Sequence, residues 1–184
     1  MLPWGHAAVG YLAYRGLRAA RGRDVPPPAA VVAVAVGSQA PDLVDKPLAW
    51  TLGVLPAGRS LGHSLLVAAA VAVLVGRVRA VRSRPAAATG FAVGALSHAL
   101  ADAAGPVLAG TPAVASFLFW PALPLYVDDA GYSVLAVFRS LSLTPDVLAG
   151  LALTAVAAVV WLRDGAPGTG VIARTLRSRA RGTQ

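Results

Sequence analysis

The sequence predicts an all-α protein, a multi-pass transmembrane helix bundle of about five spans with a proline-broken re-entrant or interfacial segment at 103–138. Three observations predict this fold class. Hydrophobic residues make up 57% of the chain and charged residues only 13%, whereas soluble domains are about 25% charged. Mean hydropathy is +0.66. The arginines gather in short runs that each follow an apolar stretch, which is typical of positive-inside patterning. We expect a single integral-membrane domain over residues 1–184.

The expected spans are the apolar stretches between the arginine runs. Each is about as long as the shorter membrane helices, and several begin just behind a proline, which is favourable in the first turn of a helix. In chain order they are 1–14, 25–41, 60–76, 85–101 and 147–162. A basic tail at 163–184 follows the last span.

The segment 103–138 is apolar but carries four prolines, at Pro106, Pro112, Pro121 and Pro124. A regular span through it is not expected, because proline removes a helix hydrogen bond and its ring clashes with the preceding turn. Irregular backbone facing lipid would leave amides unpaired, so we expect this segment to pack against protein without a net crossing.

Charge placement predicts the orientation. If the arginine loops at 15–23 and 77–84 and the tail face the cytoplasm, the five spans alternate without adjustment. The protein is then expected in the cell membrane, with a cytoplasmic C-terminal tail and its remaining polar residues near the outer leaflet. The net charge of +8 is explained by this patterning, so a nucleic-acid partner is not expected. The absence of cysteine excludes disulfides, thiolate metal sites and cysteine nucleophiles.

The three histidines of the chain fall on three different spans, at one membrane depth. Asp102 follows His98 at i+4, so the two side chains share one helix face. With the acids that end the second span, six side chains converge near the outer leaflet: His6, His63, His98, Asp42, Asp45 and Asp102.

A buried aspartate in a span costs about 2.5–3.5 kcal/mol on insertion scales, so three of them need compensation. Lys46, Arg59, backbone groups or water would supply it, and so would one or two divalent ions. Three imidazoles with three carboxylates suit Zn²⁺ or another first-row metal. The alternative is that each histidine is a hydrogen-bonded interfacial residue and each aspartate a helix cap.

Five short motifs follow one another along the chain. They are Gly5-His6-Ala7-Ala8-Val9-Gly10, Ala40-Pro41-Asp42-Leu43-Val44-Asp45, Arg59-Ser60-Leu61-Gly62-His63-Ser64, Gly94 to Asp102, and Phe119-Trp120-Pro121. With these motifs in this order, the chain resembles the membrane-bound, metal-dependent hydrolases of the YdjM type over residues 1 to about 125.

The resemblance implies an all-helical multi-pass protein with a divalent-metal site. The ligands it implies are His6, Asp42, His63, His98 and Asp102, holding Zn²⁺ as one ion or two. The second metal is less secure, because Val44 stands where many members have a second acid.

The expected chemistry is hydrolysis of an ester or phosphoester by metal-activated water, on a lipid-like or amphiphilic substrate that enters from the bilayer. Asp45 is the expected general base, and Arg59 the expected anchor for an anionic group. The alternative for Arg59 is a side chain that snorkels to the interface. The alternative function is a non-catalytic metal-binding membrane protein, a transporter or a scaffold. A transport path is disfavoured, since the inner halves of the spans are almost wholly Ala, Val, Leu and Gly.

Overall fold

The computed structural model describes the chain except for residues 24, 127–132, 134–138, 140–141, 172 and 175–184. The described residues form helices and loops, with no strand among them, so the predicted all-helical fold is confirmed. The elements are α1 (Pro3–Ala19), α2 (Pro28–Gly37), α3 (Ala40–Lys46), the π-helix η1 (Pro47–Thr51), α4 (Leu65–Val75), α5 (Arg79–Arg82), α6 (Pro85–Leu108), the 3₁₀ helix η2 (Pro112–Phe119) and α8 (Pro145–Arg163).

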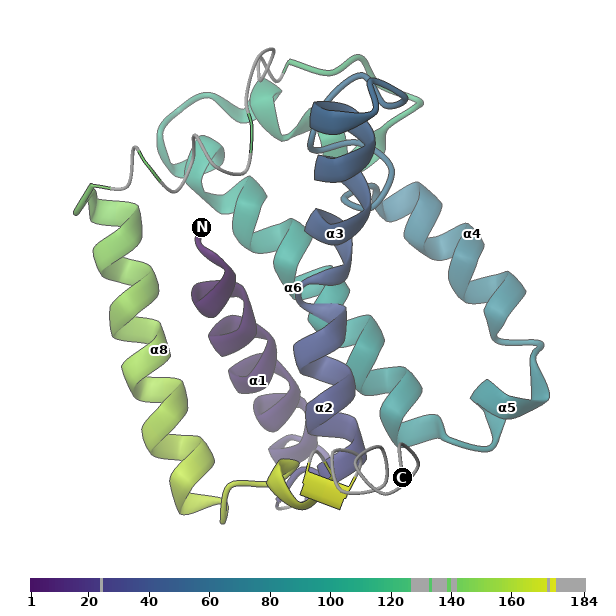
Figure 1. The fold of residues 1–184 in the computed structure, drawn as a ribbon, viewed down its shortest axis with the longest axis vertical. Coiled ribbons are helices and arrows are strands. Elements are labelled where there is room, and N and C mark those ends of the chain that lie inside the picture. The colour runs from purple at the N-terminus through teal and green to yellow at the C-terminus, as the bar shows by residue number, and fades with distance from the viewer. Residues whose placement is uncertain (24, 127–132, 134–138, 140–141, 172, 175–184) are drawn as a thin grey trace, which may run out of the picture.

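Helix starts follow the prolines and hydroxyl caps of the sequence. The helices α1, α2, α6 and α8 each begin at a proline, whose missing N–H would have had no helical partner there. Ser64 caps α4, its Oγ accepting from the Val67 amide at 3.2 Å. The helices α1, α2, α4, α6 and α8 alternate in direction along the chain (Figure 1).

The centre of the bundle is α6, which packs on α2 through glycines. A Cβ atom at Gly94 would lie 2.4 Å from the Val34 carbonyl oxygen, and one at Gly90 would lie 2.6 Å from that of Ala30. Close approach through small residues is the usual way in which membrane helices associate. The contact fixes the height of α6 against the end of α2, where the polar residues lie.

The last helix, α8, packs against α1. Near one end, a Cβ atom on Gly5 would lie 3.4 Å from the Cα of Gly150. At the other end, the Asp164 carboxylate accepts from the Tyr11 hydroxyl at 2.7 Å and from Arg15 Nε at 2.9 Å. The two contacts hold α8 along the length of α1.

Two of the described helices are long and apolar enough to cross a membrane, α6 and α8. The expectation of about five spans is therefore wrong. The stretch 25–41 forms a helix of 10 residues and 60–76 one of 11, which rise only about 15–17 Å against a hydrocarbon core of about 30 Å. The first stretch forms the 17-residue α1, but its last turns carry Arg15 and Arg18.

The segment 103–138 begins more regularly than expected. Helix α6 continues through Pro106 to Leu108, because a proline so near the C-terminal end removes only one hydrogen bond of the last turn. The chain then forms η2 and a turn up to residue 126. Most of the remainder of this segment, and half of the tail at 163–184, lie outside the described residues.

Candidate metal centre

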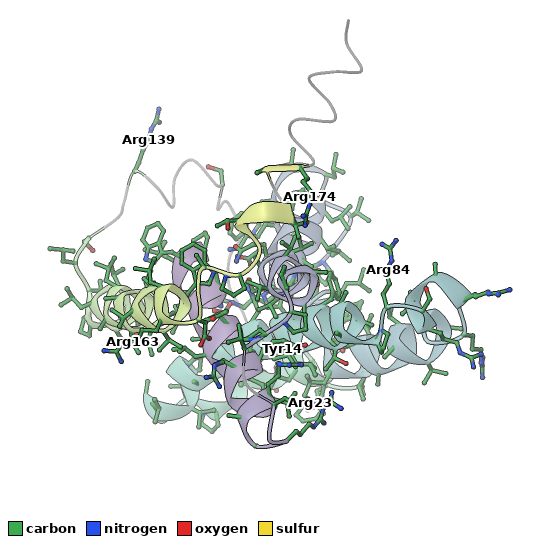
Figure 2. The ribbon with its side chains drawn as sticks, turned by 90° about the horizontal axis from the view of Figure 1, so that it is seen from below. Tyr14, Arg23, Arg84, Arg139, Arg163 and Arg174 are labelled. Atoms are coloured by element: carbon green, nitrogen blue, oxygen red, sulfur yellow. The ribbon has the colours of Figure 1, made fainter. Side chains whose placement is uncertain are left out.

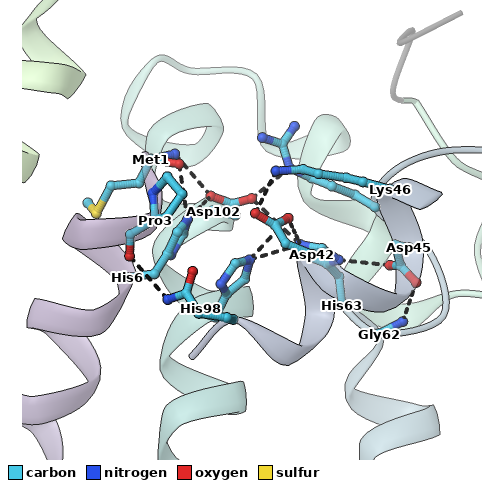
Figure 3. Close-up of polar contacts among 12 residues, drawn as sticks. Met1, Pro3, His6, Asp42, Asp45, Lys46, Gly62, His63, His98 and Asp102 are labelled. Carbon is cyan, nitrogen blue, oxygen red and sulfur yellow. Dashed lines mark hydrogen bonds and ion pairs between the residues drawn. The ribbon is translucent and has the colours of Figure 1, made fainter. Parts of the chain in front are cut away.

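The six acidic and imidazole side chains singled out in the sequence come together at one end of the bundle (Figure 3). The rings of His6 and His98 stack with centroids 3.7 Å apart, and His63 Nε2 lies 3.1 Å from His98 Nε2. All three imidazoles are buried. The predicted convergence of these residues is confirmed, whereas their role as ligands stays a prediction.

Three helices and one loop bring these residues to the same end of the bundle. His6 lies on α1, and His98 and Asp102 lie one turn apart on α6. The acids come from α3, where Asp42 and Asp45 are separated by about one turn.

The loop before α4 carries His63 and is wrapped around Asp45. The Asp45 carboxylate accepts from the backbone amides of Ser60 at 2.8 Å and Gly62 at 2.7 Å. Gly62 is required by the packing, because a Cβ there would lie 2.9 Å from the Pro41 Cα. These contacts explain why α4 begins only at Leu65.

The hydrogen bonds of His63 and His98 fix their tautomers. His98 Nδ1 lies 2.6 Å from the Ser38 carbonyl oxygen, which only accepts, so Nδ1 carries the proton. His63 Nδ1 lies 2.8 Å from Asp45 Oδ2, and this carboxylate already accepts two amides, so here too Nδ1 donates. When both rings are neutral, both Nε2 atoms are unprotonated, and their lone pairs face each other across 3.1 Å. Only a proton or a metal ion makes such a contact attractive.

Two carboxylate oxygens lie beside the Nε2 pair. Asp42 Oδ1 is 3.6 Å from His63 Nε2 and 3.5 Å from that of His98. It is buried and has no hydrogen-bond partner in the part of the chain that is described. Asp102 Oδ2 lies 3.7 Å from His63 Nε2. Ligands in tetrahedral zinc sites lie about 3.3 Å from one another, given Zn–N bonds of about 2.0–2.1 Å. The spacing of Asp42 Oδ1 and the two Nε2 atoms therefore fits a small divalent ion.

His6 extends the cluster on the side of Asp102. Its Nε2 lies 3.3 Å from Asp102 Oδ1 and 3.1 Å from the Met1 carbonyl, and both of these oxygens accept. The Nδ1 atom of His6 is buried with no hydrogen-bond partner among the described residues. Two overlapping groups have spacing suited to a metal, His6/His98/Asp102 and Asp42/His63/His98, and His98 belongs to both.

Two half-exposed cations border the cluster. Lys46 Nζ contacts Asp42 Oδ2 at 2.5 Å and lies over the Trp50 ring. Arg59 Nε donates to Asp102 Oδ2 at 2.7 Å, and about a third of its side chain is exposed, 35%. Burial raises the pKa of the Asp42 carboxyl, but the His98 imidazole when it is protonated, and the Lys46 ammonium, outweigh burial and hold this pKa well below its ordinary value. Asp42 is therefore ionised.

The role of general base expected for Asp45 does not fit this geometry. The carboxylate is fully buried, and its oxygens accept from two amides and from His63 Nδ1. The carboxylate is thus engaged in orienting His63 and the loop before α4. The Ser38 carbonyl, which holds His98, had no signal in the sequence, because a backbone acceptor is available at every residue.

Comparison with known families adds one finding. The model of the family described as YdjM inner membrane protein matches residues 1–168. The match extends past residue 125, where the recognised motifs end, and takes in α8. No curated protein and no solved structure matches the chain.

Proposed function

The chain belongs to the YdjM inner membrane protein family, and on this premise we propose that it is a membrane-embedded, metal-dependent hydrolase. Its substrate is a lipid-like or amphiphilic phosphoester. One observation carries the proposal. The Nε2 atoms of His63 and His98 face each other with their lone pairs at 3.1 Å, and beside them lies Asp42 Oδ1, which has no hydrogen-bond partner among the described residues.

The residues fit a divalent ion on their own chemistry. Histidine ligands of metals typically donate the other ring N–H to a carboxylate or a backbone carbonyl. His63 does so to Asp45 and His98 to Ser38. With Asp42 Oδ1, they make a three-ligand set of two nitrogens and one oxygen, which suits Zn²⁺. The other group, His6/His98/Asp102, shares His98; because the one free nitrogen of His98 binds a single ion, a second ion would be held by His6 and Asp102 alone.

Each residue then has a defined part in the reaction. When bound, the ion supplies Lewis-acid activation of a water molecule. Asp45 keeps His63 in the Nδ1–H tautomer, and the Ser38 carbonyl does the same for His98. His6 holds Asp102 through its Nε2, at 3.3 Å. Arg59 would anchor an anionic group of the substrate, as the sequence suggested.

The local charge favours a phosphoester over a neutral carboxylic ester. Asp42 pairs with Lys46 and Asp102 with Arg59, and Asp45 adds a third negative charge. A divalent ion would leave the site with net positive charge, even without the Met1 ammonium, which contacts Asp102 at 3.1 Å. A buried positive site attracts an anionic substrate and stabilises the negative charge that develops as a phosphoester is attacked.

The arginines support an outward-facing site. Arg23 follows α1, Arg84 precedes α6 and Arg163 ends α8 (labelled in Figure 2), so they lie at the end of the bundle opposite to α3, which carries Asp42 and Asp45 (Figure 1). By the positive-inside rule this end and the tail face the cytoplasm, and the cluster lies near the outer leaflet.

Thiol labelling tests this orientation, since the chain has no cysteine. Val54, in the loop after η1, is 68% exposed, and Ser83 lies in the arginine loop between α5 and α6. We expect Val54→Cys to react with an impermeant reagent in intact cells and Ser83→Cys to react only after lysis. The reverse pattern would move the site to the cytoplasmic face.

Activity is tested with the full chain in mild detergent. We expect hydrolysis of bis(p-nitrophenyl) phosphate that disappears with a chelator and returns with Zn²⁺, with p-nitrophenyl acetate a poorer substrate. His98→Ala is the inactive control. Bound metal without turnover of either compound would support the non-catalytic metal-binding protein or transporter, and absence of metal would support the scaffold.

A further inference from the structure

An apolar groove runs along α1 between α2 and α8, away from the metal centre. It has a volume of about 280 Å³ and is lined only by Ala, Val, Thr, Trp and Tyr side chains. His6 is two residues from Trp4, so it lies on nearly the opposite face of α1. The lining includes Trp4, Ala8 and Tyr11 of α1, Val31 of α2, and Ala158 and Trp161 of α8.

The walls of the groove are joined at one end by the chain that follows α8. Trp161 Nε1 donates to the Pro167 carbonyl at 3.1 Å. A Cβ on Gly168 would lie 3.4 Å from Val32 of α2. The spacing between α2 and α8 is therefore set by the fold and does not depend on an occupant.

The same face of α1 ends in two arginines. Trp4, Ala8 and Tyr11 lie on this face. Arg15 and Arg18, four and seven residues after Tyr11, lie on the same face of the helix. Arg15 pairs with Asp164, and the Tyr11 hydroxyl binds the same carboxylate. Arg18 Nε is buried and has no hydrogen-bond partner within the described residues. Beyond the apolar groove there is thus a guanidinium whose Nε has no acceptor among the described residues.

We propose that this groove binds one anionic phospholipid, with an acyl chain along α1 and the phosphate at Arg18. The face from Arg18 to Trp4 is about 21 Å long at 1.5 Å per residue. One leaflet of the hydrocarbon core is about 15 Å deep, so the face is long enough for an acyl chain. The arginines lie at the end assigned to the cytoplasm, where basic side chains attract anionic headgroups. This site is independent of the metal centre and of the proposed hydrolysis.

Native mass spectrometry of the full chain in mild detergent tests the proposal. The probes are phosphatidylglycerol and phosphatidylcholine with identical acyl chains. We expect one phosphatidylglycerol per chain, a preference of at least tenfold over phosphatidylcholine, and no effect of a chelator. Equal binding of the two lipids, or uptake without saturation, would overturn the proposal.

Two pairs of variants locate the lipid. Ala158→Trp fills the groove from an exposed position of α8, and Val159→Trp, one residue on and outside the lining, is its control. Ala158→Trp should lower the amount of phosphatidylglycerol bound per chain at least tenfold. Arg18→Gln should bring the two lipids within about twofold, whereas Arg21→Gln, at an exposed position, should not. Unchanged binding in either test variant would overturn the site.

The parent chain gives a second readout if Ala158→Trp does not fold. Trp4 and Trp161 line the groove, whereas Trp50 and Trp120 do not. Phosphatidylglycerol brominated on its acyl chains should quench tryptophan fluorescence more strongly in Trp50→Phe/Trp120→Phe, which keeps the two groove tryptophans, than in Trp4→Phe/Trp161→Phe, which lacks them. Equal quenching of the two variants would place the lipid elsewhere.

Discussion

The two ends of the helix bundle both bury charged side chains, but they satisfy them differently. At the arginine end, Asp164 accepts from Tyr11 and from Arg15 through one oxygen, at 2.7 and 2.9 Å. At the other end, Asp42 Oδ1 lies between two imidazole nitrogens with no donor among the residues described. Buried polar groups are normally paired. The first arrangement therefore holds α1 and α8 together, whereas in the second a bound cation would satisfy the Asp42 oxygen and the imidazole nitrogens beside it.

We expect the largest effect on metal affinity from replacing Asp42, whose Oδ1 has no hydrogen-bond partner among the described residues. Asp42→Asn keeps the shape and removes the charge of the orphaned oxygen. Metal affinity should fall by about 100-fold or more, since even outer partners of metal ligands contribute about 10–100-fold. Thermal stability without metal should fall by only about 1 kcal/mol or less, because Oδ1 makes no hydrogen bond and the Lys46 pair with Oδ2 is a partly exposed i, i+4 pair. Competition with a zinc-binding dye measures the affinity, and an affinity within threefold of the parent would contradict the assignment.

Asp45 lies at the same end but is fully satisfied, so its replacement should affect both properties. Asp45→Asn weakens the hold on His63 Nδ1 and on two amides. We expect metal affinity to fall about 10–100-fold. Loss of charge-assisted hydrogen bonds, worth about 1.5–3 kcal/mol each, should lower the melting temperature as well. A variant with lower metal affinity and unchanged melting would show that Asp45 does not hold the loop.

Asp164 is the matched carboxylate at the arginine end. Asp164→Ala removes the acceptor shared by Tyr11 and Arg15 and should cost about 1–3 kcal/mol of stability. Metal content should stay that of the parent, because the residue is remote from the cluster. Differential scanning fluorimetry and elemental analysis of one preparation measure both. Loss of metal here would mean that the two ends are coupled through α1.

The sequence was informative about which residues meet, because three histidines on separate apolar stretches have little reason to be buried singly. The i, i+4 spacing of His98 and Asp102 predicted their common face, and the structure has them in one cluster. The family resemblance is also confirmed, over a longer part of the chain than the motifs covered.

The sequence was less informative about lengths and partners. The apolar content of 60–76 predicted a span. In the structure, the amides of residues 60 and 62 donate to the Asp45 carboxylate and hold this part of the chain in a loop. Only 11 residues therefore form α4. Pro106 suggested a break, yet it falls in the last turn of α6. The role of Asp45 depends on which atoms face it, and hydrogen bonds to backbone amides leave no mark in a sequence.

The metal content of the purified chain tests the central claim most directly. The full chain, prepared in mild detergent without chelator and dialysed against metal-free buffer, is compared by elemental analysis with His63→Ala/His98→Ala, which removes both facing nitrogens. We predict about one divalent ion per parent chain, chiefly zinc, and none in the double variant. A parent without metal that also fails to take up added Zn²⁺, or a double variant with as much metal as the parent, would contradict the account.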